Sequence, residues 1–149
     1  MYYLTEAGVK FINELSDKDI EQERGEFERV AGGDKKKTEI EMAAARKGRE
    51  TTTKSLKGVE NTDATDIKPG FSGLRKAVRI LKKGGRDRAR RRRVYNQVKS
   101  GTQDASIIRL SGKGKDKKRE LVAGNTRAMM SRALGKPIKV HVYRAKNNK

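Results

Sequence analysis

The segment 121–144, LVAGNTRAMMSRALGKPIKVHVYR, decides the fold that we expect for this chain. The apolar residues at its start, with the two residues before them, predict a strand over 119–123. Gly124 and the polar residues after it predict a turn into a helix over 128–134. A glycine and a proline then end this helix, and residues 138–144 alternate between apolar and polar side chains, which is typical of a strand.

The last predicted strand has one face for a core and one for solvent, because successive side chains of a strand point to opposite faces. The side chains expected to face inward are Ile138, Val140 and Val142, and those expected to face outward are Lys139, His141 and Tyr143. An outward His141 is either a solvated surface residue or a neighbour of a binding site. Tyr143 and Tyr95 either stack on the bases of a ligand or pack within the protein.

A hairpin and two basic helices precede this segment. A short strand is predicted over 106–110, and the polar, glycine-containing turn 111–118 leads from it into the return strand. Before the hairpin, residues 74–83 place apolar side chains on one helical face, and residues 86–99 form a second predicted helix that ends in a Ser-Gly C-cap signal. The resulting order is typical of an α+β domain.

The N-terminal part shows weaker helical patterns. Short helices are predicted over 1–16, over the acidic stretch 17–30 with an interruption at Gly25, and over 34–49. Residues 49–72 are rich in Thr, Gly, Asp and Lys and show no periodicity, which is typical of a linker. We therefore expect three parts, a helical arm over 1–50, a linker over 51–72 and a basic domain over 73–149.

The order of elements in the basic domain resembles the ParB/sulfiredoxin superfamily. In that family the return strand ends in a Gly-x-x-Arg turn that opens a helix, and a second glycine precedes the last strand. Gly124 and Arg127 match the turn, and Gly135 with residues 138–142 matches the closing section. The resemblance implies a small mixed sheet with packed helices. The Gly-Asn-Thr-Arg variant in a short, lysine-rich chain is similar to the ParB-like proteins of phages.

The chain also differs from the family pattern in two respects. Partition proteins carry Glu-Arg-Arg after the glycine, where this chain has Asn125, Thr126 and Arg127. Sulfiredoxins need a catalytic cysteine, and this chain has none. Sulfiredoxin chemistry is therefore excluded, and hydrolysis of CTP by the partition-protein route does not follow from the resemblance.

The composition excludes further classes of protein. Of the 149 residues 33% are hydrophobic, so the core is small. The lack of cysteine excludes disulfides, thiolate catalysis and Cys-based zinc sites, and the single histidine argues against a His-rich metal centre. No apolar run approaches the roughly 20 residues of a membrane span, and the N-terminus lacks a signal-peptide pattern. We therefore expect a cytoplasmic protein with no membrane partner.

The net charge of +19 lies in the second half of the chain. Residues 1–70 carry a net charge of −2, and residues 71–149 carry +21. A concentration of one sign opposes compact folding by self-repulsion, and a polyphosphate is the usual partner that relieves it. The charge pattern therefore favours binding to DNA or RNA. The alternatives are a merely soluble basic protein and binding to an anionic membrane, but no basic helix here has the Trp-, Phe- or Leu-rich face that membrane binding needs.

The turn after the return strand is the first candidate site. Free amides at a helix start, with the positive end of the helix dipole, form an anion seat, here through the amides of residues 126–129. Arginine can add bidentate contacts to phosphate. The candidate phosphate- or nucleotide-binding residues are Gly124, Asn125, Thr126, Arg127 and Ala128. The alternative is a plain turn in which Asn125 or Thr126 caps the helix and Arg127 is solvated.

The second candidate site is the basic surface of the predicted helices. Because consecutive helical residues point about 100° apart, a run of arginines surrounds its helix and can follow a phosphate backbone. The candidate nucleic-acid-binding residues are Arg79, Lys82, Lys83, Arg86, Arg88, Arg90, Arg91, Arg92, Arg93, Lys113 and Lys115. The alternative for the arginine run is a solvated charge run, and the two hairpin lysines either extend the surface or keep a loop soluble.

Three functions stay open on the sequence alone. The first is binding to nucleic acid, mostly through its phosphate backbone, with the acidic arm docking a partner or shielding the basic surface. The second is a nucleotide-dependent enzyme, an NTPase, kinase or nuclease, with a possible nucleotide and magnesium as cofactors; Glu120 and Asp104 are then the nearby carboxylates, and no catalytic residue or metal ligand is assigned. The third is a phage structural or assembly protein that contacts DNA, in the host cytoplasm or the virion, with a homo-oligomer or an assembly partner.

Overall fold

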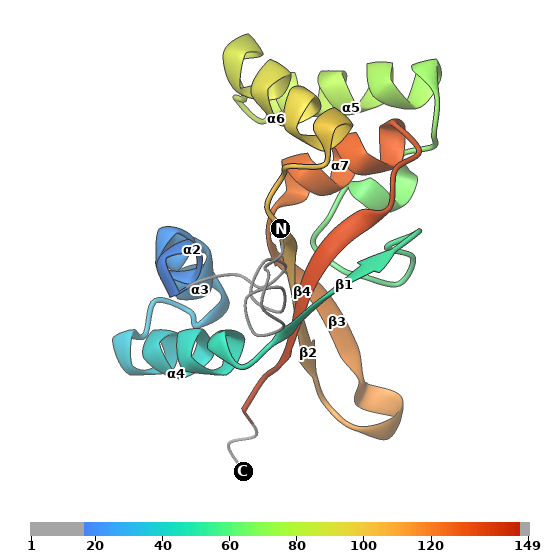
Figure 1. The fold of residues 1–149 in the computed structure, drawn as a ribbon. Helices are drawn as coiled ribbons and strands as arrows, with labels where there is room; N and C mark the ends of the chain where they lie inside the picture. Colours follow the sequence, from blue (N-terminus) through green and yellow to red (C-terminus); the bar gives the residue numbers. More distant parts are fainter. Residues whose placement is uncertain (1–16, 147–149) are drawn as a thin grey trace, which may run out of the picture.

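A four-stranded mixed sheet lies between two groups of helices in the computed structural model, which describes residues 17–146 (Figure 1). The strands are β1 (Arg49–Thr53), β2 (Ser106–Ser111), β3 (Lys118–Ala123) and β4 (Ile138–Arg144). They lie in the order β1-β4-β2-β3; β4 is parallel to β2 and antiparallel to β1, and β2 and β3 form an antiparallel hairpin. The expected α+β class is confirmed. The helix expected over residues 1–16 lies outside the described residues.

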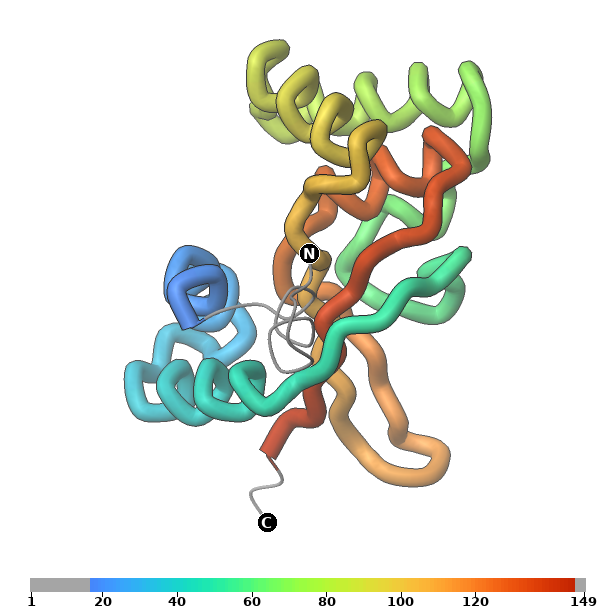
Figure 2. The backbone as a smooth tube through the Cα atoms, in the orientation of Figure 1, coloured from blue at the N-terminus to red at the C-terminus, as the bar shows by residue number. Residues whose placement is uncertain are grey.

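The central position of β4 joins the two halves of the chain. From the end of β3 the helix α7 (Asn125–Ala133) leads the chain back over the sheet, and β4 then enters between β1 and β2. Thr51 of β1 is opposite Val140 of β4, and Ser106 of β2 lies on the other side of the same residue. Figure 2 shows β1 running beside β4 although the two strands are far apart in the sequence.

Three helices lie on one side of the sheet and form the first core with it. They are α5 (Phe71–Lys83), α6 (Arg88–Ser100) and α7; α7 lies against the strands, and α5 and α6 pack on α7 (Figure 1). The helix α6 buries only Val94 and Val98, which are one turn apart. Asp87 caps its start by accepting a hydrogen bond of 2.7 Å from the Arg90 amide, and Gly101 ends it in a left-handed conformation, as expected. Arginines make up much of the remaining, unburied surface of α6.

The N-terminal helices cover the opposite face. They are α2 (Asp17–Gln22), α3 (Arg24–Val30) and α4 (Lys35–Arg46), and we call them the arm. Their buried side chains, led by Ile20, Phe27 and Met42, form a second core with the sheet. The expected interruption at Gly25 falls instead at Glu23, between α2 and α3. Among residues 17–146, no helix is long and apolar enough to cross a bilayer.

The arm also changes the environment of the last strand. His141 and Tyr143, expected to face outward, point away from the first core as the alternation requires, but both side chains are only 2% exposed. The interpretation of His141 as a solvated residue was wrong because the arm covers that face of the sheet. Tyr143 packs within the protein, which is one of the two alternatives that the sequence left open. The Tyr143 ring packs against Phe27 of α3 with the ring centroids 6.1 Å apart. The alternation in β4 therefore predicted correctly which side chains share a face, but not that both faces are buried.

The segment expected as a linker over 51–72 is part of the domain instead. Its first residues belong to β1, which pairs with β4 along its length. The apolar residues further along, Leu56, Val59, Ala64 and Ile67, are all buried in the first core. The composition is polar because only a few side chains of the segment are buried.

Candidate nucleic-acid interface

The turn between β3 and α7 requires a glycine. Gly124 has a φ of +92°, in the left-handed region, and a Cβ there would lie 2.6 Å from the Ser106 hydroxyl oxygen. The same hydroxyl donates a hydrogen bond of 2.8 Å to the Gly124 carbonyl. The glycine therefore lets the turn pack against the start of β2, and the close approach is to the protein itself.

The start of α7 presents backbone amides that no side chain caps. Gly124 occupies the N-cap position without a side-chain hydrogen bond, and the helix begins at Asn125, three residues before the sequence predicts. The first helical bond is donated by the Ala128 amide to the Gly124 carbonyl at 2.9 Å. The amides of Asn125, Thr126 and Arg127 consequently have no partner within the helix, which shifts the expected anion seat towards its N-terminal end.

Asn125 has a different role from the capping or phosphate contact that we expected. Its side-chain oxygen accepts hydrogen bonds from the Thr62 hydroxyl at 2.7 Å and from the Asp63 amide at 3.1 Å. Its amide nitrogen donates to the Asp63 carboxylate at 3.2 Å. Thr126 and Ala128 are buried. Asn125 therefore fastens the preceding loop to α7, and the seat itself consists of backbone amides and Arg127.

Arg127 is held loosely by the arm. Its Nη2 lies 3.4 Å from Glu23 Oε2 and 3.3 Å from the Ala105 carbonyl oxygen, both at the long end for hydrogen bonds. Its Nε is buried and has no hydrogen-bond partner among the described residues. The alternative of a fully solvated Arg127 is therefore wrong, since its side chain is only 19% exposed.

These groups line a cavity of about 380 Å³ between the arm, α6 and the start of α7. Four guanidinium groups border it, from Arg29, Arg86, Arg90 and Arg127. The carboxylates of Glu23 and Glu26 border it from the arm side. The cavity thus combines a helix start, four cations and two acids. We call it the α7 cavity.

The arginines on α6 and just before it divide between two sides of the helix. Arg86 and Arg90 face the α7 cavity. Arg88, Arg91 and Arg92 line a groove between α6 and α5. The division follows from the helical rotation of about 100° per residue, and it agrees with the expectation that the arginines surround the helix.

The remaining candidates fall into two places. On α5, Arg79 and Lys82 border a shallow apolar hollow beside the α5–α6 groove, and Lys83 is exposed at the end of the helix. Lys113 and Lys115 lie at the tip of the β2–β3 hairpin, at the opposite end of the molecule from α5 and α6 (Figure 1). The hairpin lysines therefore do not continue the surface of α6.

The bases of α5 and α6 are not neutralised by the described acids. Residues 71–100 contain twelve Lys and Arg residues and one acid, Asp87. Within residues 17–146 none of these twelve bases forms an ion pair. The arm acids pair mainly with arginines of the arm itself, Glu21 with Arg24 and Glu26 with Arg29. Within the described residues, the arm therefore forms ion pairs with the bases of the second half only at Arg127, in the α7 cavity, and at Arg109, in the sheet.

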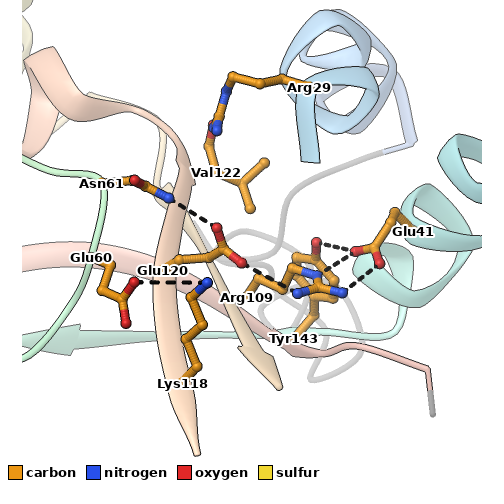
Figure 3. Close-up of polar contacts among 9 residues, drawn as sticks. All are labelled: Arg29, Glu41, Glu60, Asn61, Arg109, Lys118, Glu120, Val122 and Tyr143. Carbon is orange, nitrogen blue, oxygen red and sulfur yellow. Dashed lines mark hydrogen bonds and ion pairs between the residues drawn. The ribbon is translucent and has the colours of Figure 1, made fainter. Parts of the chain in front are cut away.

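A buried polar network attaches the arm to the sheet, and sequence reasoning missed it. Arg109 of β2 donates two hydrogen bonds to the Glu41 carboxylate of α4, at 2.8 and 2.9 Å, and one to Glu120 of β3 at 3.2 Å (Figure 3). The Tyr143 hydroxyl donates to Glu41 at 2.7 Å, and Asn61 donates to the other Glu120 oxygen at 2.9 Å. The hydrogen bonds that Arg109 donates to the Glu41 carboxylate raise the pKa of Arg109. Burial, and then Glu41, raises the pKa of Tyr143.

The network decides the role of Glu120. The sequence placed it among the carboxylates near the seat, but its side chain is committed to Arg109 and Asn61 and does not border the α7 cavity. The carboxylates that do border the cavity are Glu23 and Glu26. In the described part of the chain no three His, Cys, Asp or Glu side chains gather as metal ligands would. His141 Nε2 donates to the Ala45 carbonyl at 2.6 Å, so the histidine joins the arm to β4.

The comparisons with known proteins give no relative for this chain. No family model matches it, and neither a curated protein nor a solved structure is significantly similar to it.

Proposed function

We propose that this protein binds nucleic acid through phosphate contacts made by α5 and α6. The observation that carries the proposal is the concentration of bases on these two helices, which the described acids leave without ion pairs. Ten of the twelve side chains are exposed, and Arg86 and Arg91 are half-buried. Such a surface attracts polyphosphate at long range and releases condensed counterions on contact.

The α7 cavity adds a place for a single phosphate. Its guanidinium groups and the uncapped amides of α7 offer charge-assisted hydrogen bonds, and the Nε of Arg127 has an unused donor. A phosphate there would compete with Glu23 for Arg127, whose present contact is 3.4 Å long. We propose that the cavity holds a terminal phosphate or the phosphate of a nucleotide.

We also propose that the domain is a ParB-like module. The support is the succession of β3, the Gly124 turn, α7 and β4, with β4 parallel to β2. Contacts to phosphate fix a protein on nucleic acid without reading its bases, so the proposed binding tolerates different sequences.

Binding of a labelled oligonucleotide, followed by fluorescence anisotropy at about 50 mM salt, tests the proposal. The α6 variant replaces Arg88, Arg92 and Arg93 with Gln, which keeps the helix and removes three exposed charges. The matched control replaces Lys35, Lys36 and Lys47 with Gln; these exposed residues lie on or directly after α4, away from α5 and α6 (Figure 1).

We expect the α6 variant to bind roughly ten- to a hundredfold more weakly than the wild type, because each lost phosphate contact weakens binding to all sequences. The control loses the same net charge and should change affinity by less than about threefold, since distant exposed charges are screened. Failure of the wild-type protein to bind at this salt, or equal losses in the two variants, would overturn the proposal.

A further inference from the structure

The groove between α5 and α6 is apolar at its base and basic along its rim. It has a volume of about 500 Å³. Met130 of α7, which is 1% exposed, contributes to its lining, and Leu74 and Val78 of α5 form the apolar part of one wall. Tyr95, which is half-buried, lines the α6 side. No residue that lines the groove is acidic.

The basic rim continues from the groove onto the outer side of α5. Leu74 and Val78 also line the neighbouring hollow, whose other side chains are the cationic Arg75, Arg79 and Lys82. The two depressions therefore share an apolar strip that has cations on both of its sides. On the α6 side these cations are Arg88, Arg91 and Arg92.

This combination discriminates between forms of nucleic acid. A duplex presents phosphates and sugars at its surface and keeps its bases stacked inside, so its backbone would satisfy the cations and leave the apolar strip uncovered. A single strand can turn its bases outward, and bases stack on aromatic side chains while the backbone follows a line of cations. Of the two ligands, only the single strand would cover the exposed part of the apolar strip and of Tyr95.

We propose that the α5–α6 groove is a binding site for single-stranded nucleic acid, with one or more unpaired bases against Tyr95 and the Leu74–Val78 strip. This inference rests on the proposed function and specifies its ligand. The arginines of α6 bind the phosphates on one side of each inserted nucleobase. The Lys and Arg side chains of α5 bind the phosphates on the other side. The complementary charge favours this occupant over an apolar segment of protein.

Three labelled probes with the same backbone length test the inference: a single strand, the same strand in a duplex, and a single strand of abasic residues. All three carry phosphates, and only the first offers unpaired bases. We expect the wild-type protein to bind the single strand roughly tenfold more tightly than the abasic strand, since stacking strengthens binding with each base engaged. It should also prefer the single strand to the duplex at equal salt.

Two variants of one residue locate the effect. Tyr95→Leu keeps an apolar side chain that can pack on the core but removes the aromatic ring. It should bring the affinity for the single strand to that of the abasic strand and leave the affinity for the abasic strand unchanged. Tyr95→Phe keeps the ring and should bind like the wild type. Circular dichroism and a melting curve show whether each variant is folded.

The results separate this inference from the proposed function. Equal affinity of the wild type for the single strand, the abasic strand and the duplex would overturn the inference, even if Tyr95→Leu failed to fold. Binding to all three that still depends on the α6 arginines would leave the proposed function in place. Lack of binding to any probe would overturn both.

Discussion

Arg127 Nη2 on α7 lies 3.4 Å from Oε2 of Glu23, the residue between α2 and α3 of the acidic arm. This contact joins the basic half of the chain to the acidic arm at the α7 cavity. Because Glu23 is 29% exposed at its side chain and the contact is long, the ion pair is a weak one. A phosphate that enters the cavity therefore has a modest competitor for Arg127.

Removal of that competitor should strengthen phosphate binding. We expect Glu23→Gln to tighten the binding of pyrophosphate several-fold, since it removes a negative charge from the wall of the cavity. Glu28→Gln is the control, because Glu28 is an exposed residue of the same arm that does not border the cavity. Isothermal titration calorimetry measures both. Identical affinities in the two variants would mean that phosphate does not enter the α7 cavity.

The backbone of the turn sets a second expectation. Gly124→Ala should lower the free energy of unfolding by roughly 1–3 kcal/mol, because alanine is strained at positive φ and its Cβ would meet Ser106. Gly25→Ala should instead raise it by about 0.5–1 kcal/mol, since Gly25 lies within α3 with open space around it. Urea unfolding followed by circular dichroism gives both values. A larger loss of stability for Gly25→Ala than for Gly124→Ala would contradict the described conformation of the turn.

The arm should depend on its buried network. We expect Glu41→Gln to cost about 2–4 kcal/mol of stability, since it leaves the partly buried Arg109 guanidinium without its bidentate partner. Glu39→Gln, on the same helix, removes an exposed partner of Arg24 and should cost less than about 1 kcal/mol. Urea unfolding compares the two. Equal costs would indicate that the network does not hold the arm.

Tyr143 predicts a loss of stability at high pH. Its pKa is raised in the folded protein by burial and by Glu41, so the unfolded state releases this proton first as the pH rises. Its contribution to stability is complete below the unfolded value of about 10 and is lost as the pH increases above it. The difference in phenolate absorbance between the wild type and Tyr143→Phe should stay near zero until the protein unfolds. A normal titration of this phenol in the folded protein would contradict the buried environment.

The sequence predicted the elements whose signals are local. The hairpin, α7 and β4 appeared within a few residues of their predicted bounds because alternation, glycine and proline mark them. The C-cap at Gly101 was correct for the same reason. Local signals also predicted which side chains of β4 face the first core, since successive side chains of a strand point to opposite faces.

These local signals could not predict contacts between elements that are far apart in the sequence. The strand β1 and the four buried residues after it were taken for a linker, although its three consecutive threonines are β-branched and could have indicated a strand. The Glu41–Arg109–Glu120 network joins three elements that no spacing connects. Similarly, the acidic composition of the arm did not show that Glu23, among several acids, reaches Arg127.

The salt dependence of binding tests the central claim most directly. If α5 and α6 together neutralise six to ten phosphates, a plot of log K against log salt for a single strand should have a slope of roughly −4 to −7. The variant that lacks Arg88, Arg92 and Arg93 should lose about two units of that slope, since each removed contact with a single strand contributes about 0.7. A flat plot, or a variant with the wild-type slope, would contradict the account.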